Sequence, residues 1–201
     1  MSARPRLMPL PLALVSFSLL LSSCSTLLGF TPERAVIREI MQTSDPNFTI
    51  LPDSVQVLQS VDWNEDVLVI AVYQRSGRNN QIENCLDVYI VEMTRTGWMA
   101  GSGGSGCMTA GAMDQPVDAA GGSLSLENEP AISYTYGLVH DPKIAAIEVT
   151  WSDEQVQVVE VVNGSYIAIR SDFVFHQKVR GLDAEGASQF ASPAIEVAPG
   201  K

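Results

Sequence analysis

Two of the three cysteines are spaced so that they can form a disulfide bond. Cys85 and Cys107 lie on either side of a turn centred between Arg95 and Thr96. Facing residues of an antiparallel pair have numbers with a constant sum, which is 191 for this turn, and the two cysteines sum to 192. A one-residue bulge in the glycines of 101–106 would bring them opposite each other. The spacing predicts a Cys85–Cys107 disulfide in an oxidising compartment, with two separate buried thiols as the alternative.

The third cysteine, Cys24, follows a segment built like a signal peptide. Arg4 and Arg6 give the first six residues a positive charge, and residues 10–21 (LPLALVSFSLLL) are apolar. Small residues come directly before Cys24. A positive start, a short apolar stretch and a small-residue end are typical of a cleaved export signal, which we place at residues 1–23.

The four residues Leu21-Ser22-Ser23-Cys24 resemble the lipobox of bacterial lipoproteins. The resemblance implies cleavage between Ser23 and Cys24 and a lipid on the Cys24 thiol, which anchors the chain to a membrane and leaves it facing outside the cytoplasm. Ser25 is not the aspartate that resembles an inner-membrane retention signal, so the choice between inner and outer membrane stays open. An uncleaved membrane span is the alternative, because residues 7–32 carry no charge, but prolines and serines interrupt its apolar character.

The two histidines, His140 and His176, lack the neighbours that catalysis or metal binding needs. A Ser-His-Asp site requires a serine and an orienting acid around the base, and the sequence has no GxSxG turn for such a serine. Neither histidine has a second ligand two or four residues after it that would indicate zinc. We expect no metal site and no catalytic histidine, with His176 in a half-buried structural position.

Two short motifs match known sites only in part. Residues 101–106 (GSGGSG) fit the GxGxxG pattern of nucleotide-binding loops, but no convincing helix follows to meet a pyrophosphate. Residues 62–66 (DWNED) begin like a calcium loop, yet Val67 and Tyr73 stand where that loop needs glycine and glutamate. We expect a flexible loop at the first segment, a hairpin turn at the second, and no cofactor.

Carboxylates are the chemistry that is hardest to exclude. The chain has 23 acidic residues, and a pair of them can hydrolyse glycosides. Four candidates, Glu83, Asp87, Glu92 and Glu148, lie in or beside predicted strands, where a pair could converge across a sheet. The alternative is that they form the polar face of half-exposed strands, as alternation in a sandwich requires.

The charge of the chain argues against nucleic acid as a partner. The formal net charge is −11, and removal of residues 1–23 leaves 10 of the 12 basic residues against 23 acidic ones, a net −13. Phosphate backbones and anionic lipid headgroups are repelled by such a surface. The expected partners are therefore the membrane, through the Cys24 lipid, and an unknown envelope protein or polymer.

The fold that must position these residues is mainly β, with one helix near the start. Thr31-Pro32-Glu33 is typical of a helix start, Val36, Ile37, Ile40 and Met41 form one helical face, and Asp45-Pro46-Asn47 ends the helix. Alternation and turn residues then predict antiparallel strands. These are 55–61, 67–73, 86–91, 98–100, 132–139, 144–151, 156–162, 166–170 and 179–183.

Two of these features bear on the packing. Residues 67–73 (VLVIAVY) are apolar on both faces, which predicts a central strand covered on both sides. Asn163-Gly164 between two strand-like segments predicts a hairpin turn, because both positions of a type I′ turn have positive φ.

The domain boundaries follow from composition. We expect a lipidated tether at 24–30, an α+β antiparallel-sheet domain at 31–118, a β-sandwich module at 119–190 and a flexible tail at 191–201. The glycine-rich segment 101–122 between the two domains is predicted to be a long loop.

The second half resembles Ig-like β-sandwich modules of exported bacterial proteins, many of unknown function. The resemblance covers roughly residues 130–187. It rests on Gly137-Leu138-Val139, Asp141, Ile144, Ile147–Trp151, Asn163–Tyr166 and Val179–Gly186. Gly181 departs from the pattern, and the turn at 152–155 lacks the usual Asp-Gly. The resemblance implies a fold and carries over no catalytic residue.

Together these observations favour a lipid-anchored, non-catalytic binding module of the cell envelope. A hydrolase with an unrecognised carboxylate site and a purely structural envelope protein are the alternatives. An exposed apolar or aromatic patch, with Trp63 or Trp98 as candidates, would favour binding. A pocket of converging polar side chains around either histidine would favour an enzyme.

Overall fold

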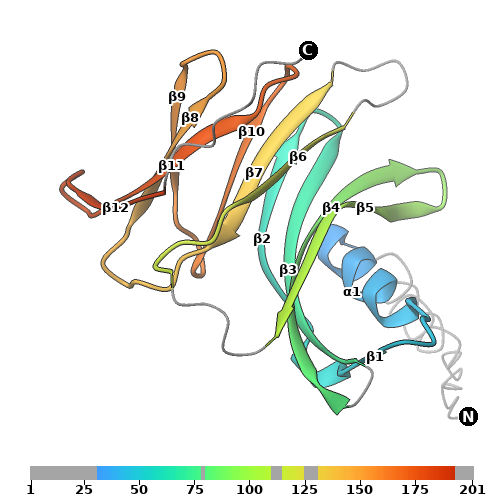
Figure 1. The fold of residues 1–201 in the computed structure, drawn as a ribbon. Helices are drawn as coiled ribbons and strands as arrows, with labels where there is room; N and C mark the ends of the chain where they lie inside the picture. Colours follow the sequence, from blue (N-terminus) through green and yellow to red (C-terminus); the bar gives the residue numbers. More distant parts are fainter. Residues whose placement is uncertain (1–30, 78–79, 110–114, 125–130, 193–201) are drawn as a thin grey trace, which may run out of the picture. The chain divides into compact units, whose positions relative to one another are not determined.

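The computed structural model describes residues 31–77, 80–109, 115–124 and 131–192. The predicted signal peptide, the tether and Cys24 lie outside these residues, as does the tail from residue 193. One α-helix, α1 (Pro32–Gln42), and one 3-10 helix, η1 (Pro52–Ser54), stand among the strands in this part of the chain (Figure 1). The strands are β1 (Thr49–Ile50), β2 (Gln56–Trp63), β3 (Asp66–Ser76), β4 (Ile82–Thr94), β5 (Gly97–Thr109), β6 (Ala120–Leu124), β7 (Ile132–Leu138), β8 (Ala146–Trp151), β9 (Val156–Glu160), β10 (Ser165–Arg170), β11 (His176–Leu182) and β12 (Ser188–Ala191).

The strands form three antiparallel sheets, which confirms a mainly β fold with one N-terminal helix. The first sheet has five strands in the order β1-β3-β4-β5, with β2 also paired to β3. The second has three, β10-β7-β6, and the third has four, β12-β11-β8-β9. The second and third sheets enclose a core around Trp151, Tyr166 and Val179, and this is the predicted C-terminal β-sandwich.

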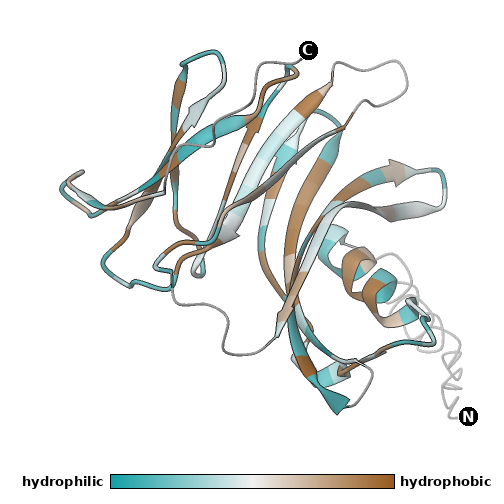
Figure 2. Cartoon of the chain, in the orientation of Figure 1, coloured by the Kyte–Doolittle hydropathy of each residue, from teal (hydrophilic) through white to brown (hydrophobic). Residues whose placement is uncertain are grey.

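β3 is covered on both faces, as its two-sided apolar sequence predicts. Val67, Val69 and Ala71 face α1 and belong to the helix-side core. Leu68 and Ile70 point the other way and share a core with β7 and β10 of the second sheet. Figure 2 shows β3 hydrophobic along most of its length. Because the two cores use alternate residues of one strand, the helix, the first sheet and the sandwich are stacked in layers. The division at residue 118 stays a prediction about independent folding.

The helix buries a narrower stripe than its sequence predicts. Ala35, Val36 and Ile40 are buried, whereas Ile37 is 38% and Met41 is 44% exposed. Ile37 and Met41 each follow a buried residue and are rotated about 100° away from the sheet, since an α-helix has about 3.6 residues per turn. The helix ends at Gln42, where the Thr43 N–H still donates to the Glu39 carbonyl.

The Cys85–Cys107 disulfide is present, and it forms in the predicted way. Cys85 faces Cys107 across β4 and β5, with the Cα atoms 4.0 Å apart. The register of this hairpin shifts by one residue between Val88 and Tyr89, within the glycine-rich stretch of β5. The bulge moves the pairing sum from 191 near the turn to 192 at the cysteines, which places the two thiols opposite each other.

The predicted loop at 101–122 is wrong for most of its described residues. Residues 101–109 continue β5, and residues 120–124 form β6, which pairs with β7. Glycine and serine give no hydropathy alternation, so the strand has no sequence signature. Because the glycines of β5 have no side chains, tyrosines of the second sheet can pack directly against its backbone. The Tyr134 hydroxyl donates to the Gly103 carbonyl, and a Cβ on Gly104 would lie 3.2 Å from the Tyr136 hydroxyl.

The Asn163-Gly164 turn forms, but it does not join two strands of one sheet. Asn163 has φ 51° and Gly164 has φ 71°, the two positive values of the predicted turn type. β9 before the turn pairs with β8, and β10 after the turn pairs with β7. The turn therefore carries the chain from the third sheet to the second.

The predicted flexible tail begins too early. Ala191 is the last residue of β12 and faces Arg180 of β11. The Ser192 N–H donates to the Val179 carbonyl at 2.8 Å. No helix within the described ranges has both the length and the apolar composition to cross a membrane.

The close approach of the Asp118 backbone to β7 at Gly137 gives a stability prediction. A Cβ on Gly137 would overlap the Asp118 carbonyl oxygen and lie 2.8 Å from the Tyr166 ring. We expect Gly137→Ala to lower the free energy of unfolding by about 1–3 kcal/mol, because backbone must move to admit the methyl group. Gly106→Ala is the matched control, since nothing lies within 4 Å of a Cβ there. Urea unfolding of both variants checks the prediction, which equal midpoints would contradict.

Candidate functional site

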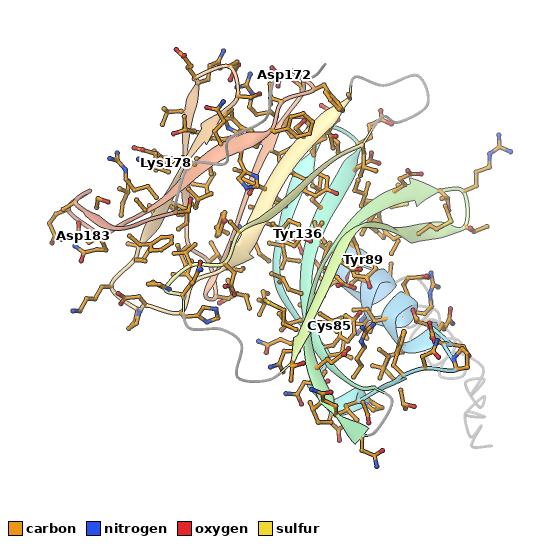
Figure 3. The ribbon with its side chains drawn as sticks, viewed as in Figure 1. Cys85, Tyr89, Tyr136, Asp172, Lys178 and Asp183 are labelled. Atoms are coloured by element: carbon orange, nitrogen blue, oxygen red, sulfur yellow. A yellow bond between two sulfur atoms is a disulfide. The ribbon has the colours of Figure 1, made fainter. Side chains whose placement is uncertain are left out.

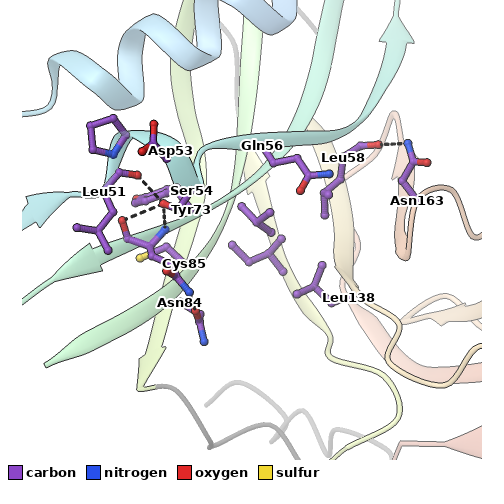
Figure 4. Close-up of a pocket in the computed structure, with 14 residues that line it drawn as sticks. Leu51, Asp53, Ser54, Gln56, Leu58, Tyr73, Asn84, Cys85, Leu138 and Asn163 are labelled. Carbon is purple, nitrogen blue, oxygen red and sulfur yellow. Dashed lines mark hydrogen bonds between the residues drawn. The ribbon is translucent and has the colours of Figure 1, made fainter.

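A cleft of about 930 Å³ opens where the first and second sheets part. Its apolar floor comes from Leu58 of β2, Val72 of β3, Leu86 of β4 and Leu138 at the end of β7. All four pack at the margin of the core between these two sheets. We call this space the intersheet cleft (Figure 4).

The cleft exists because β3 and β4 continue past the sheet that covers them. Along the covered face, Ile70 and Val88 are fully buried, and Val72 and Leu86 are half-buried. The next residues on this face are polar: Gln74 on β3 and Asn84 on β4. The switch from apolar to amide side chains marks the point where the shared core ends and the cleft begins.

Amide side chains form much of the rim. The Asn163 Nδ2 donates to the Leu58 carbonyl at 2.8 Å, which ties the β9–β10 turn to β2 at one end of the cleft (Figure 4). The Gln74 Nε2 donates to the Asn84 Oδ1 at 3.0 Å on the other side. The Gln56 side chain is exposed and adds a third amide to the lining. The rim therefore presents neutral donors and acceptors.

η1 closes the far end of the cleft. The Ser54 hydroxyl donates to the Leu51 carbonyl at 2.6 Å and accepts the Gln74 N–H at 2.7 Å, which fixes the short helix against β3. Asp53 of η1 is the sole ionisable side chain among the described lining residues, apart from Tyr73, whose side chain belongs to the helix-side core. An apolar floor with a neutral amide rim can bind uncharged ligands but offers no acid–base pair.

The histidines do not line this cleft, but one of them has an acid partner. The His140 Nε2 lies 2.8 Å from the Asp118 Oδ2, and the Tyr166 hydroxyl donates to the Asp118 carbonyl. His140 is two residues beyond Leu138, so the pair lies near the Leu138 end of the cleft. No serine, threonine or cysteine of the described chain is hydrogen-bonded to His140, so a base and an orienting acid are present without a nucleophile.

His176 is half-buried, as predicted. Burial lowers the pKa of its imidazole, because desolvation disfavours the charged form. Its ring lies beside β6, where a Cβ on Gly121 would be 2.8 Å from the Nδ1 atom. Within the described ranges, no group of three or more His, Cys, Asp or Glu side chains could hold a metal ion.

The four candidate carboxylates do not pair with one another. Glu83 forms an ion pair with Arg75 at 2.6 Å, and Glu148 forms one with Arg180 at 2.7 Å. Glu92 is exposed near the end of β4. Such contacts are typical of the polar faces of half-exposed strands, which the sequence analysis gave as the alternative to a catalytic carboxylate pair.

Asp87 is different, because it is buried beneath the helix-side core. It is 4% exposed, and its Oδ2 accepts hydrogen bonds from the Tyr73 hydroxyl at 2.9 Å and the Tyr89 hydroxyl at 3.2 Å. Its Oδ1 has no partner within the described residues. Burial raises the pKa of Asp87, although hydrogen bonds from both tyrosines and from the Gly106 backbone oppose the shift. Figure 3 places Tyr89 and Cys85 on the strand that carries Asp87.

The two tryptophans named as binding candidates are not exposed patches. Trp63 packs against the core between the sheets, and Trp98 packs against the helix-side core. Large exposed apolar side chains occur instead on β9 and before β11, at Val156, Val158, Phe173 and Phe175. Sequence reasoning missed the cleft itself, whose one signal is the change from Val72 to Gln74 along β3.

Searches with protein-family models, against curated proteins and against solved structures found no match for this chain. Function is therefore inferred from the geometry of the intersheet cleft and from the sequence.

The buried carboxyl gives a pH prediction. Because the pKa of Asp87 is raised in the folded state, its stabilising contribution is complete below the ordinary value of 3.8 and is lost as the pH rises through the folded value. Relative to Asp87→Asn, the wild type should lose stability as the pH rises above about 4. Urea unfolding over a pH series measures the difference, with Glu92→Gln as an exposed control on the same strand. If the difference in unfolding free energy between the wild type and Asp87→Asn is constant with pH, Asp87 does not titrate as predicted.

Proposed function

We propose that this chain is a lipid-anchored lipoprotein of the cell envelope whose folded part binds a partner through the intersheet cleft and is not an enzyme. The observation that carries the binding role is the cleft, with an apolar floor and a rim of neutral amides. Its volume lies within the range of about 300–1,000 Å³ that is common for ligand sites.

Two features support export and anchoring. The residues Leu21–Cys24 match the form of a lipobox, and residues 1–23 have the build of an export signal. The Cys85–Cys107 disulfide fits an oxidising compartment, because disulfides persist mainly outside the cytosol.

The chemistry of the cleft favours a protein segment as the ligand. An amide side chain offers both a donor and an acceptor, which are the groups of a peptide bond. Leu58, Val72 and Leu86 would receive apolar side chains of that segment. The near absence of charge in the lining disfavours phosphate and carboxylate ligands, and the acidic surface disfavours nucleic acid.

The anchor is tested by changing its cysteine. Cys24→Ala should block processing and leave a full-length precursor, because only a thiol can take the diacylglycerol. Ser25→Ala should be processed normally. Mass spectrometry of the membrane fraction measures both. Wild-type protein that keeps residues 1–23 and an unmodified Cys24 would contradict the anchor.

The cleft is tested by filling it from its rim. Gln56→Trp adds bulk at an exposed lining position, whereas Glu92→Trp adds the same bulk at an exposed position on β4 that does not line the cleft. Partners are captured from detergent-solubilised envelopes and quantified by mass spectrometry. We expect Gln56→Trp to lower recovery of the partner about tenfold, or about 1.4 kcal/mol of binding free energy, and Glu92→Trp to leave it unchanged.

Two results would contradict the proposal. Equal recovery by both variants would remove the cleft as the binding site. Hydrolytic turnover that is lost in His140→Asn but kept in Gln56→Trp would identify an enzyme built on the His140–Asp118 pair.

A further inference from the structure

β9 is an edge strand: within the part of the chain that the structure describes, no strand of its sheet pairs with its outer side. The third sheet runs β12-β11-β8-β9, so β9 pairs on one side alone (Figure 1). The Trp151 N–H donates to the Gln155 carbonyl and the Val161 N–H donates to the Ala145 carbonyl, which places the bonds to β8 on the odd-numbered residues. By alternation, the N–H and C=O groups of Val156, Val158 and Glu160 point away from β8.

The side chains of this edge are also exposed. Val156 is 57% and Val158 is 56% exposed on the outer face of the sheet. Proteins usually protect edge strands with proline, lysine or a bulge. β9 has none of these: its sequence is VQVVE, and its register with β8 is regular.

We infer that β9 is a strand-addition site for a second copy of this chain. Two β9 strands would pair antiparallel about a two-fold axis at Val158, so that two four-stranded sheets join into one. Each outward residue would donate one backbone hydrogen bond and accept one from the other copy.

The register favours a second copy, because β9 is complementary to itself. With Val158 opposite its own copy, Val156 faces Glu160 of the other chain. The one acidic residue of β9 therefore lies opposite a valine, and no like charges, which would destabilise the pair, are opposed. The pairing is confined to β9, because the Val162 N–H and carbonyl are already hydrogen-bonded to Ser165. The exposed valines of the two copies become neighbours at the centre of the joined sheet.

Lipid anchoring would assist this contact without being required for it. Chains confined to one membrane meet at a higher effective concentration than free chains. The inference does not depend on the intersheet cleft, because no residue of β9 lines that cleft.

The test uses cysteines placed by the register, in the full chain expressed in its host envelope. Val158→Cys lies on the proposed two-fold axis, where facing Cα atoms would be about 5.5 Å apart, within disulfide range. Under copper-phenanthroline oxidation it should give a covalent dimer on a non-reducing gel. Glu160→Cys is the matched control, because that residue faces Val156 of the other copy. We expect at least about fivefold more dimer from Val158→Cys, since only the axial residue meets itself.

A second change separates strand pairing from chance collision. Val156→Pro removes an outward N–H but no bond to β8, so it should abolish the Val158→Cys dimer while protease resistance stays unchanged. The inference is overturned if Val158→Cys stays monomeric, if Glu160→Cys cross-links equally, if Val156→Pro leaves the dimer intact, or if the adduct contains a different protein.

Discussion

The structure depends on the burial of both faces of β3. A strand with apolar side chains on both faces must be covered on each face. Here α1 covers one face of β3 and the second sheet covers the other. The second sheet is in turn half of the sandwich, so this one strand links the helix to the C-terminal half through two separate cores. Each hydrophobic row on β3 stabilises a different layer.

The contact between the first and second sheets is possible because β5 has almost no side chains where the tyrosines of β7 arrive. Tyr134 and Tyr136 reach over Gly103 and Gly104, and burial raises the pKa of Tyr136 to about 12. Larger residues at these two positions would hold the sheets apart. The glycine-rich stretch that resembles a linker in the sequence is therefore a packing surface. The same bulged stretch sets the register that brings Cys107 to Cys85.

Sequence reasoning predicted what alternation and local turn chemistry determine. The central position of β3 follows from a segment that is apolar on both faces, and the turns at 64–65 and 95–96 follow from local turn signals. The disulfide follows from residue spacing within a hairpin. It failed where the signal is carried by tertiary contact. Residues 101–109 of β5 and 120–122 of β6 have little hydropathy alternation, so they were predicted to be part of a loop. Ile37 and Met41 are apolar but lie outside the stripe that touches the sheet. The intersheet cleft joins residues from β2, β4 and the β9–β10 turn, which no local pattern relates.

The position of the intersheet cleft beyond the last buried row has a consequence for how the protein can vary. Gln56 and Gln74 are exposed and contribute little buried apolar area, so replacing them removes few of the contacts that hold the layers together. Residues of the proposed binding rim are thus separate from the residues that keep the fold. A scaffold of this kind can change the side chains of its rim with little loss of stability, so the ligand preference of the proposed site would be free to diverge faster than the architecture.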